Sequence, residues 1–428
     1  MPLVAGVDSS TQSTKVEIRD LDSGELVASG SAPHPATTPP RSEQDPAAWW
    51  LAFEDAWAQC GVTEVAAISV GGQQHGMVAL DGERQVIRPA KLWNDTETAP
   101  DAGWLLKQLP GRGADWAGAC GSVPVAAFTI TKLSWLHRSE PDAWSRLAHV
   151  LLPHDWMTYR LTGELVTDRG DASGTGYWSA ADEDYRWDLL AIVDKDRDWT
   201  GVVPRVLGPL DVAGEWRGAV VAPGTGDNMA AALGLGLEPG DVAVSLGTSG
   251  TAYTVSEHPT ADPSGSIAGF ADATGRFLPL ACTLNATKVT EAVRRLLGVD
   301  HEGLDELALA APAGAGGLTL LPYLDGERTP NRPKASGVLA GLRSDVSREA
   351  LARAAFEGVV CSMLDAVAAL GTFCPVGGRL LLTGGGARSA AYRQLLADLS
   401  GRTVTVPSLA EAVATGACVQ AAATARQV

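Results

Sequence analysis

The stretch that decides the fold is Leu3-Val4-Ala5-Gly6-Val7-Asp8-Ser9-Ser10-Thr11-Gln12-Ser13-Thr14-Lys15-Val16-Glu17-Ile18. An apolar run ends in a cluster of small hydroxyl residues and then resumes, which predicts two strands joined by a tight turn, a β-hairpin. Such residues leave backbone N–H groups uncovered and add hydroxyl donors. The turn is therefore suited to binding a phosphate group.

The same pattern occurs a second time, far downstream. The apolar run Val242-Ala243-Val244-Ser245-Leu246 leads into Gly247-Thr248-Ser249-Gly250-Thr251 and resumes at residues 252–255. Only the first copy carries an acidic residue, Asp8. Two phosphate-binding hairpins in two halves of one chain predict a nucleotide held between two related domains.

Bulk properties limit the classes of function. A chain of 428 residues predicts two to three domains. Its formal charge of −17 argues against a nucleic-acid partner, which requires a basic surface. ATP is still allowed, because backbone N–H groups and Mg²⁺ bind phosphate within an acidic protein.

The cysteines and the apolar runs bear on location. Six cysteines are scattered without a C-x-x-C pair, which favours small buried thiols in a reducing cytosol. The chain reaches strand-like sequence by Leu3 without a basic leader, and no apolar run approaches 18 residues. We therefore expect a cytoplasmic protein without a membrane partner.

Strand and helix patterns alternate in both halves, which predicts an α/β fold with a duplicated unit. In the first half we expect helix 47–59, started by Asp45-Pro46 and with Trp49, Trp50 and Trp57 in the core, and a helical connection followed by turns over 178–222. A glycine turn near residue 223 divides the chain into domains 1–222 and 223–428. The remaining expected elements are strands at 3–7, 15–20, 25–32, 65–70 and 379–383 and helices at 130–139, 228–236, 285–297, 347–370 and 389–399.

One carboxylate stands in a glycine turn, Pro223-Gly224-Thr225-Gly226-Asp227-Asn228, just before an apolar helix. Taken alone, Asp227 is more simply a helix N-cap, since aspartate is favoured there. The uncluttered turn would also let Asp227 accept a proton from a substrate hydroxyl. At an ordinary pKa of ~3.9, it would be ionised at neutral pH.

Two other segments carry groups that could bind hydroxyls. Gln74 and His75 follow a buried strand within Gly71-Gly72-Gln73-Gln74-His75-Gly76. Trp93 and Asn94 offer an aromatic face and an amide in Leu92-Trp93-Asn94-Asp95. A structural histidine and an ordinary turn with a packed tryptophan are the simpler alternatives. No pair among the other histidines has metal-ligand spacing.

A third glycine-rich segment lies near the C-terminus. Leu381-Leu382-Thr383 leads into Gly384-Gly385-Gly386-Ala387 and then into a predicted helix. Glycines there let the backbone approach a ligand closely, and a helix start favours an anion or a flat nucleoside. Glycine-rich strand–helix turns are common, so this segment alone predicts function only at about even odds.

Taken in chain order, these segments resemble the FGGY family of carbohydrate kinases, of the actin-like, sugar kinase and heat-shock ATPase superfamily. The ordered set spans nearly the whole chain and is more specific than any single motif. Two positions depart from the family pattern, Gln74 in place of Met and Glu291 in place of Trp. The resemblance, strongest to kinases of D-xylulose, is carried by residues 6–16, 71–80, 92–95, 152–174, 224–236, 245–257, 321–342 and 381–404.

The resemblance implies two ribonuclease-H-like domains flanking a cleft and an ATP-dependent transfer to the terminal hydroxyl of a ketopentose, D-xylulose first. Asp227 would be the general base, and Asp8 would help to bind the Mg²⁺ that accompanies ATP. The ketose would contact Gln74, His75, Trp93, Asn94, Asp227 and Asn228. The nucleotide would contact Thr11, Ser13, Gly247, Thr248, Ser249, Gly384, Gly385, Gly386 and Ala387.

Three alternatives stay open at this point. Ribulose, gluconate or glycerol could be the acceptor within the same family. An ATPase of the actin or chaperone type would share the hairpins without a sugar acceptor. A catalytically silent sugar sensor would be expected to lose Asp8 or Asp227, and both are present. The oligomeric state is open, a homodimer included.

Overall fold

The computed structural model describes residues 2–409 and 411–427. Its first half is organised around a mixed sheet with the strand order β13-β14-β5-β1-β2-β3, and β15 also pairs with β5. The predicted first hairpin is confirmed, with Asp8 opposite Lys15 in the antiparallel pair β1–β2. The strands are β1 (Leu3–Ser9), β2 (Ser13–Asp20), β3 (Leu26–Pro33), β5 (Ala67–Gly72), β13 (Gly214–Trp216), β14 (Ala219–Val221) and β15 (Thr225–Gly226).

The second half repeats this arrangement in a sheet of order β18-β19-β17-β16-β22-β23. Its hairpin β16–β17 corresponds to β1–β2, and β22 pairs parallel with β16 as β5 does with β1. The predicted duplication is therefore confirmed at the level of strand pairing. The strands are β16 (Val242–Leu246), β17 (Gly250–Thr254), β18 (Ile267–Ala271), β19 (Phe277–Thr283), β22 (Leu380–Thr383) and β23 (Val404–Thr405).

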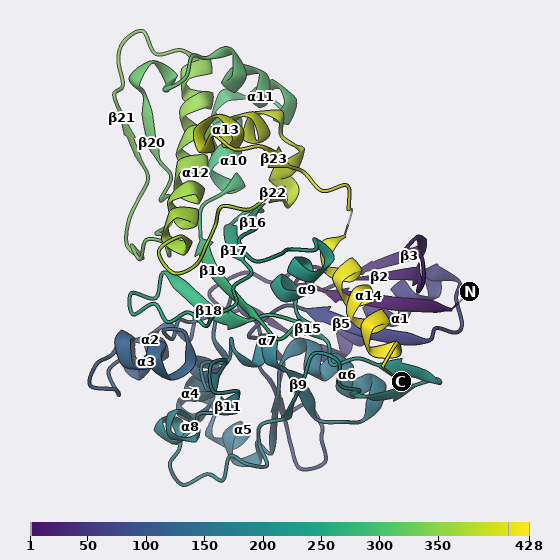
Figure 1. Ribbon diagram of the computed structural model, residues 1–428. Helices are drawn as coiled ribbons and strands as arrows, with labels where there is room; N and C mark the ends of the chain where they lie inside the picture. Colours follow the sequence, from purple (N-terminus) through teal and green to yellow (C-terminus); the bar gives the residue numbers. More distant parts are fainter. Residues whose placement is uncertain (1, 410, 428) are drawn as a thin grey trace.

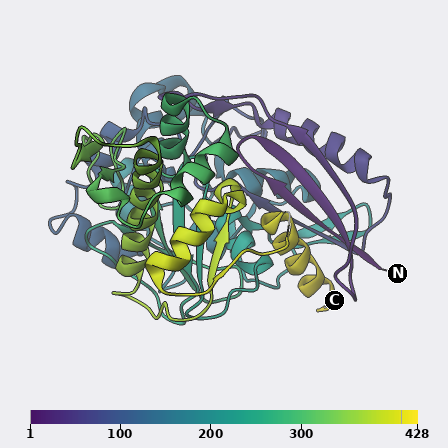
Figure 2. The same cartoon turned by 90° about the horizontal axis from the view of Figure 1, so that it is seen from above.

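Helices from both ends of the chain cover the first sheet. Alternate residues of β1 face opposite ways: Ala5 packs in the cluster that holds α1 (Pro46–Cys60), whereas Val4 packs against α14 (Ala412–Ala425). Gly6 shares the second face, and a Cβ there would lie 2.0 Å from the Ala414 carbonyl oxygen. The C-terminal helix thus returns to the N-terminal strands, beside which Figures 1 and 2 show it in yellow.

Helix α1 begins as the sequence predicts, with Asp45 capping its N-terminus ahead of Pro46. Trp49 is fully buried and donates its indole N–H to Gln44 Oε1 at 2.7 Å. Trp57 is also buried, but Trp50 is only half-buried, beneath the guanidinium of Arg160. The prediction of three core tryptophans is therefore wrong for Trp50.

We expect Trp49→Ala to destabilise the first unit by about 3–5 kcal/mol, because it leaves a cavity under the sheet and removes the edge contact with Trp156. A lower urea midpoint for this unit would show the loss. Leu51→Ala, on the exposed side of the same helix, is the matched control and should change the midpoint little. An equal shift in both variants would contradict this packing account.

Residues between β5 and β15 form a helical region below the first sheet in Figure 1. The expected turns over 178–222 are wrong in part: helix α8 is present, but five short strands accompany it, among them β13 and β14, which extend the main sheet. The helices are α2 (Ala99–Leu105), α3 (Gly113–Cys120), α4 (Thr129–Ser139), α5 (Pro141–Arg146), α6 (Pro153–Thr162), α7 (Arg169–Ala172) and α8 (Trp187–Val193). The short strands are β4 (Glu43–Gln44), β6 (Val78–Leu80), β7 (Ala90–Lys91), β8 (His149–Leu151), β9 (Val166–Asp168), β10 (Trp178–Ser179), β11 (Asp184–Tyr185) and β12 (Arg205–Leu207).

The second unit carries its own helical layer, around the long helix α12. Five of the six free cysteines are buried as predicted, whereas Cys361 on α12 is exposed. In the part of the chain that the structure describes, no helix combines the length and apolar character needed to cross a membrane. The elements are α10 (Thr287–Leu297), α11 (His301–Ala310), η1 (Ala315–Gly317), β20 (Thr319–Leu321), β21 (Val338–Ala340), α12 (Arg348–Leu370), η2 (Gly385–Arg388) and α13 (Ala390–Ser400). Helix α9 (Asp227–Gly234) instead packs against α14 beside the first sheet.

Candidate active site

Three parallel strands of the first sheet end side by side. In the register, Asp8 on β1 lies beside Gly71 on β5, and Gly71 in turn lies beside Thr225 on β15. Ligand sites in such sheets form at the carboxyl ends of the strands. The register therefore brings together three segments that are far apart in the sequence: the Asp8 turn, the Gln74-His75 segment and Asp227.

Asp8 is buried and accepts a hydrogen bond from the Ser10 hydroxyl. Its other oxygen lies 3.6 Å from Lys15 Nζ, which also forms an ion pair with Glu411 at 2.5 Å. Burial raises the pKa of Asp8, against the lowering effect of Ser10 and Lys15. A carboxylate beside a phosphate-binding turn can take part in binding a divalent cation together with a phosphate group.

Asp227 is the first residue of α9, and Gly226 holds the N-cap position without a side-chain cap. The N-cap interpretation of Asp227 is therefore wrong. Desolvation, with the charges of Asp8 and Asp171, raises the pKa of Asp227 to about 7. The expected ordinary pKa is therefore also wrong.

Asn228 connects Asp227 to the Gln74 segment. Its amide donates to Asp227 Oδ1 at 2.8 Å and to Gln74 Oε1 at 2.6 Å. A Cβ on Gly226 would lie 2.7 Å from Gln74 Cγ, so the glycine is what allows this approach. Gln74, Asn228 and Asp227 thus form one contiguous polar surface.

His75 has a left-handed backbone, with φ of 62°, which is uncommon for a residue other than glycine and clusters at functional sites. Its ring packs between Phe128 of the first unit and Phe270 of the second, at centroid distances of 5.0 and 5.2 Å. Burial lowers the pKa of His75, so the imidazole is neutral at neutral pH. A neutral imidazole can accept a hydrogen bond from a hydroxyl group.

Trp93 and Asn94 lie beside the first hairpin. The indole N–H of Trp93 donates to Thr11 Oγ1 at 2.9 Å, and the Thr11 hydroxyl faces Gln73 Oε1 at 3.3 Å. Trp93 keeps 36% of its surface exposed. The segment therefore bridges the phosphate hairpin and the Gln73-Gln74 stretch.

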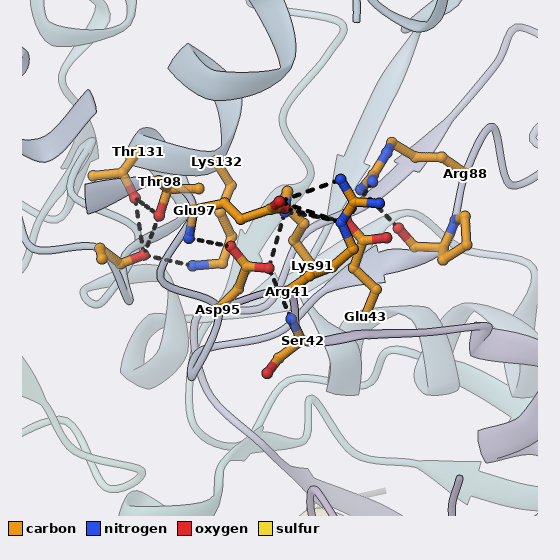
Figure 3. A network of polar contacts seen from close by, with 12 residues as sticks. Arg41, Ser42, Glu43, Arg88, Lys91, Asp95, Glu97, Thr98, Thr131 and Lys132 are labelled. Carbon is orange, nitrogen blue, oxygen red and sulfur yellow. Dashed lines mark hydrogen bonds and ion pairs between the residues drawn. The ribbon is translucent and has the colours of Figure 1, made fainter. Parts of the chain in front are cut away.

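An ionic cluster surrounds Lys91, close in sequence to Trp93 and Asn94 (Figure 3). The Lys91 ammonium lies 2.8–3.1 Å from carboxylate oxygens of Glu43, Asp95 and Glu97. These three carboxylates are close enough to hold a metal ion, but the ammonium supplies the positive charge among them. The cluster therefore joins two segments of the chain, because Asp95 also accepts a hydrogen bond from the Ser42 N–H.

The second hairpin borders a cavity of about 810 Å³. Of the predicted nucleotide residues, Thr248, Gly385 and Gly386 line this cavity. Glu291, which departs from the family pattern, lines it too. Gly247 instead accepts bonds from Thr287, and Ala387 packs in the core of the unit. The volume lies in the range of small-molecule sites, and the lining also includes residues that sequence reasoning missed, among them Lys288, Arg295, Phe356, Arg388 and Tyr392.

A further group of buried residues near the site is not among those predicted from the sequence. His154, Asp155, Asp168 and Asp171 pack together behind His75. The spacing of Asp168 and Asp171 across one helical turn was the available signal, but isolated acids with such spacing are common on exposed helices.

The comparisons with known proteins agree with this geometry. The family models for the N-terminal and C-terminal domains of the FGGY family of carbohydrate kinases match residues 3–234 and 242–425. A xylulose kinase of Streptomyces rubiginosus is 50% identical over 433 residues, covering 98% of this chain and 88% of that protein.

Solved structures give the same result. The crystal structure of xylulose kinase from Bifidobacterium adolescentis has a TM-score of 0.91 at 44% identity and covers 100% of this chain and 93% of that one. A gluconate kinase from Lactobacillus acidophilus also has a TM-score of 0.91, at 25% identity, with 100% and 89% covered. The expected actin-like fold of two ribonuclease-H-like domains is confirmed. The chain belongs to the FGGY family of carbohydrate kinases.

Proposed function

We propose that the protein transfers the γ-phosphoryl group of ATP to the terminal hydroxyl of D-xylulose, giving D-xylulose 5-phosphate and ADP. The relatives named xylulose kinase support this acceptor over others. Within the described residues, one observation carries the proposal. Among the buried polar atoms without hydrogen-bond partners, three lie on the segments around Asp227 and the first hairpin: Gln73 Nε2, Gln74 Nε2 and Asn94 Oδ1.

Unpaired buried polar groups are costly, so their clustering at one place points to a ligand that pairs with them. A ketose offers a hydroxyl or carbonyl oxygen on nearly every carbon. These amide groups match such a ligand better than they match an apolar one. An ATPase without a sugar acceptor would leave these groups unexplained.

Phosphoryl transfer asks the protein mainly for positioning and charge neutralisation. Asp227 would orient the terminal hydroxyl and accept its proton, aided by its pKa of about 7. The hydroxyls and N–H groups of Thr11, Ser13, Thr248 and Ser249 would hold the phosphates. Gly385 and Gly386 would face the adenosine in the cavity of the second unit.

The residues present fit Mg²⁺. The ion prefers oxygen ligands and is commonly held by one or two carboxylates together with substrate phosphates. Asp8 supplies such a carboxylate at the end of β1, beside the phosphate hairpin. When bound, Mg²⁺ would neutralise charge on the phosphate oxygens.

An acceptor screen tests the proposal. In a coupled ADP-release assay, kcat/KM should be highest for D-xylulose and lower for D-ribulose, L-ribulose, gluconate, glycerol and L-fuculose, because wrong hydroxyl patterns leave buried groups unpaired. A higher kcat/KM for gluconate or glycerol would overturn the acceptor assignment. The gluconate kinase neighbour makes gluconate the main competitor to include.

We expect His75→Ala to raise KM for the ketose while leaving KM for ATP nearly unchanged, because His75 lies at the strand ends of the first sheet and not in the nucleotide cavity. His149→Ala, whose imidazole bonds to Gly201 in the helical region, is the control. Steady-state kinetics in both substrates gives the comparison. A rise in KM for ATP that equals the rise for the ketose would contradict the role of His75.

A further inference from the structure

His154 stands at the centre of a buried acidic cluster that the proposed reaction does not use. Its Nε2 lies 3.1 Å from Asp155 Oδ1 and 3.3 Å from Asp168 Oδ1. Its Nδ1 faces Asp171 Oδ2 at 3.2 Å. All four side chains are nearly or fully inaccessible to solvent. Three carboxylates around one imidazole favour its charged form.

Asp171 connects this cluster to His75. Its second oxygen, Oδ1, accepts a hydrogen bond from the His75 backbone N–H at 3.3 Å and lies 3.6 Å from His75 Nδ1. That ring nitrogen is buried without a hydrogen-bond partner within the described chain. A Cβ on Gly174 would lie 2.2 Å from His75 Nδ1, so the ring lies directly against the Gly174 backbone.

Asp168 extends the cluster to the segment that carries the general base. Its carboxylate caps α7 by accepting the N–H groups of Gly170 and Asp171. It also accepts the Thr225 hydroxyl at 2.7 Å, two residues before Asp227. The cluster therefore contacts the Gln74-His75 segment through Asp171 and strand β15, which leads into Asp227, through Asp168.

The charges in the cluster support one protonation pattern. Burial disfavours an imidazolium, but the neighbouring carboxylates outweigh it and raise the pKa of His154 well above its ordinary value, whereas burial raises the pKa of Asp155 to about 7. Burial likewise opposes an ionised Asp171, yet the hydrogen bond from His154 and the nearby His75 hold its pKa below the ordinary value. Asp171 is thus an anion between a cationic His154 and a neutral His75.

We propose that Asp171, held ionised by the His154 imidazolium, is a positioning residue that fixes His75 as the Nδ1–H tautomer, so that Nε2 accepts a hydrogen bond from a hydroxyl of the sugar. The inference rests on the proposed function for the identity of that sugar. Carboxylates set the tautomer of ligating histidines in the same way at metal sites. The 3.6 Å separation would shorten on sugar binding, as such contacts commonly do.

The tautomer can be measured without any substrate. In the ¹⁵N-histidine-labelled protein, His75 should show a protonated Nδ1 and an unprotonated Nε2, assigned by the loss of its signals in His75→Gln. His154 should show both nitrogens protonated at pH values above the ordinary histidine range. A protonated Nε2 on His75, or a neutral His154, would overturn the proposal even if D-xylulose proves to be the substrate.

The functional test is Asp171→Asn. The amide cannot accept from both imidazoles, so His75 should shift toward the Nε2–H tautomer and present a donor where an acceptor is required. We expect KM for the ketose to rise ~10–100-fold with KM for ATP changed little. The control is Asp101→Asn, another buried carboxylate, bonded to Ser134 and Arg138.

The outcomes of this test are distinct. An unchanged KM for the ketose in Asp171→Asn would overturn the proposal. A general loss of folding in that variant leaves the tautomer measurement on the unmodified protein as the deciding result. A failure of the proposed function itself would show separately, as a wild-type enzyme that does not phosphorylate ketopentoses.

Discussion

Asp227→Asn is expected to lower kcat by about 10²–10⁴-fold with little change in either KM. The amide keeps the shape of the side chain and its contact with Asn228 but cannot accept a proton. Steady-state kinetics at saturating ATP and ketose measures the loss. The variant should also lose any slow ATP hydrolysis in which Asp227 activates water.

The fold of this variant should be intact, since Gly226 and not Asp227 holds the cap position of α9. Asp45→Asn is a matched control, because Asp45 does cap α1 through the Ala47 N–H. Asparagine caps nearly as well as aspartate, so this variant should retain both activity and melting temperature. A stable and fully active Asp227→Asn enzyme would contradict the mechanism.

The pH dependence follows from the same residue. The pKa of Asp227 is raised to about 7, so the base is ionised above that pH and protonated below it. On the acidic side, kcat/KM for the ketose should fall about tenfold per pH unit below about pH 7. A profile flat down to pH 5 would mean that Asp227 is not the titrating base.

The second large effect is expected for Asp8→Asn. The loss of the buried carboxylate beside the phosphate hairpin should lower kcat by roughly 10²–10³-fold at limiting Mg²⁺. Because this variant would bind Mg²⁺ more weakly, raising the Mg²⁺ concentration should restore part of the activity. Titration of kcat against Mg²⁺ for both variants separates the two aspartates.

Two outcomes of that titration are informative. Asp227→Asn should show no recovery at high Mg²⁺, since it retains Asp8. Asp20→Asn, at the opposite end of the strand that follows the Asp8 turn, should behave like the wild type, because its carboxylate only closes the turn at Ser23. Equal Mg²⁺ dependence in Asp8→Asn and the wild type would contradict the assigned role of Asp8.

Much of this architecture could be predicted because its signals are local. The hydroxyl-rich turn after β1 and its copy after β16 predict both hairpins, and their separation predicts the duplicated unit. Helix α1 could be placed from Asp45-Pro46 and its apolar periodicity. In each case the decisive residues lie within a few positions of one another.

Features that depend on distant residues could not be predicted in this way. The return of α14 to β1 requires Gly6 to leave room for a backbone more than 400 residues away. The pKa of Asp227 depends on desolvation and on two charges from other segments, Asp8 and Asp171. The short strands β13 and β14 have little pattern of their own: β14 pairs with the edge that β5 offers, and β13 pairs with β14.

The cluster around His154 shows the same limit. Its members all lie in residues 152–174, a segment that resembles the family, but that resemblance does not indicate which of them meet. Only the fold places Asp171 against His75, and the glycines at 174 and 224 leave room for the imidazoles of His75 and His154 respectively. The residues that touch a substrate are easier to recognise in sequence than those that position them.

The central claim is that Asp227 deprotonates the hydroxyl that receives the phosphoryl group. A crystal structure with D-xylulose and a non-hydrolysable ATP analogue tests it most directly. The account predicts the terminal hydroxyl about 2.6–3.2 Å from the Asp227 carboxylate and facing the γ-phosphate, with both hairpins at the phosphates. A ketose bound with that hydroxyl turned away from Asp227, or a γ-phosphate remote from Asp8, would contradict it.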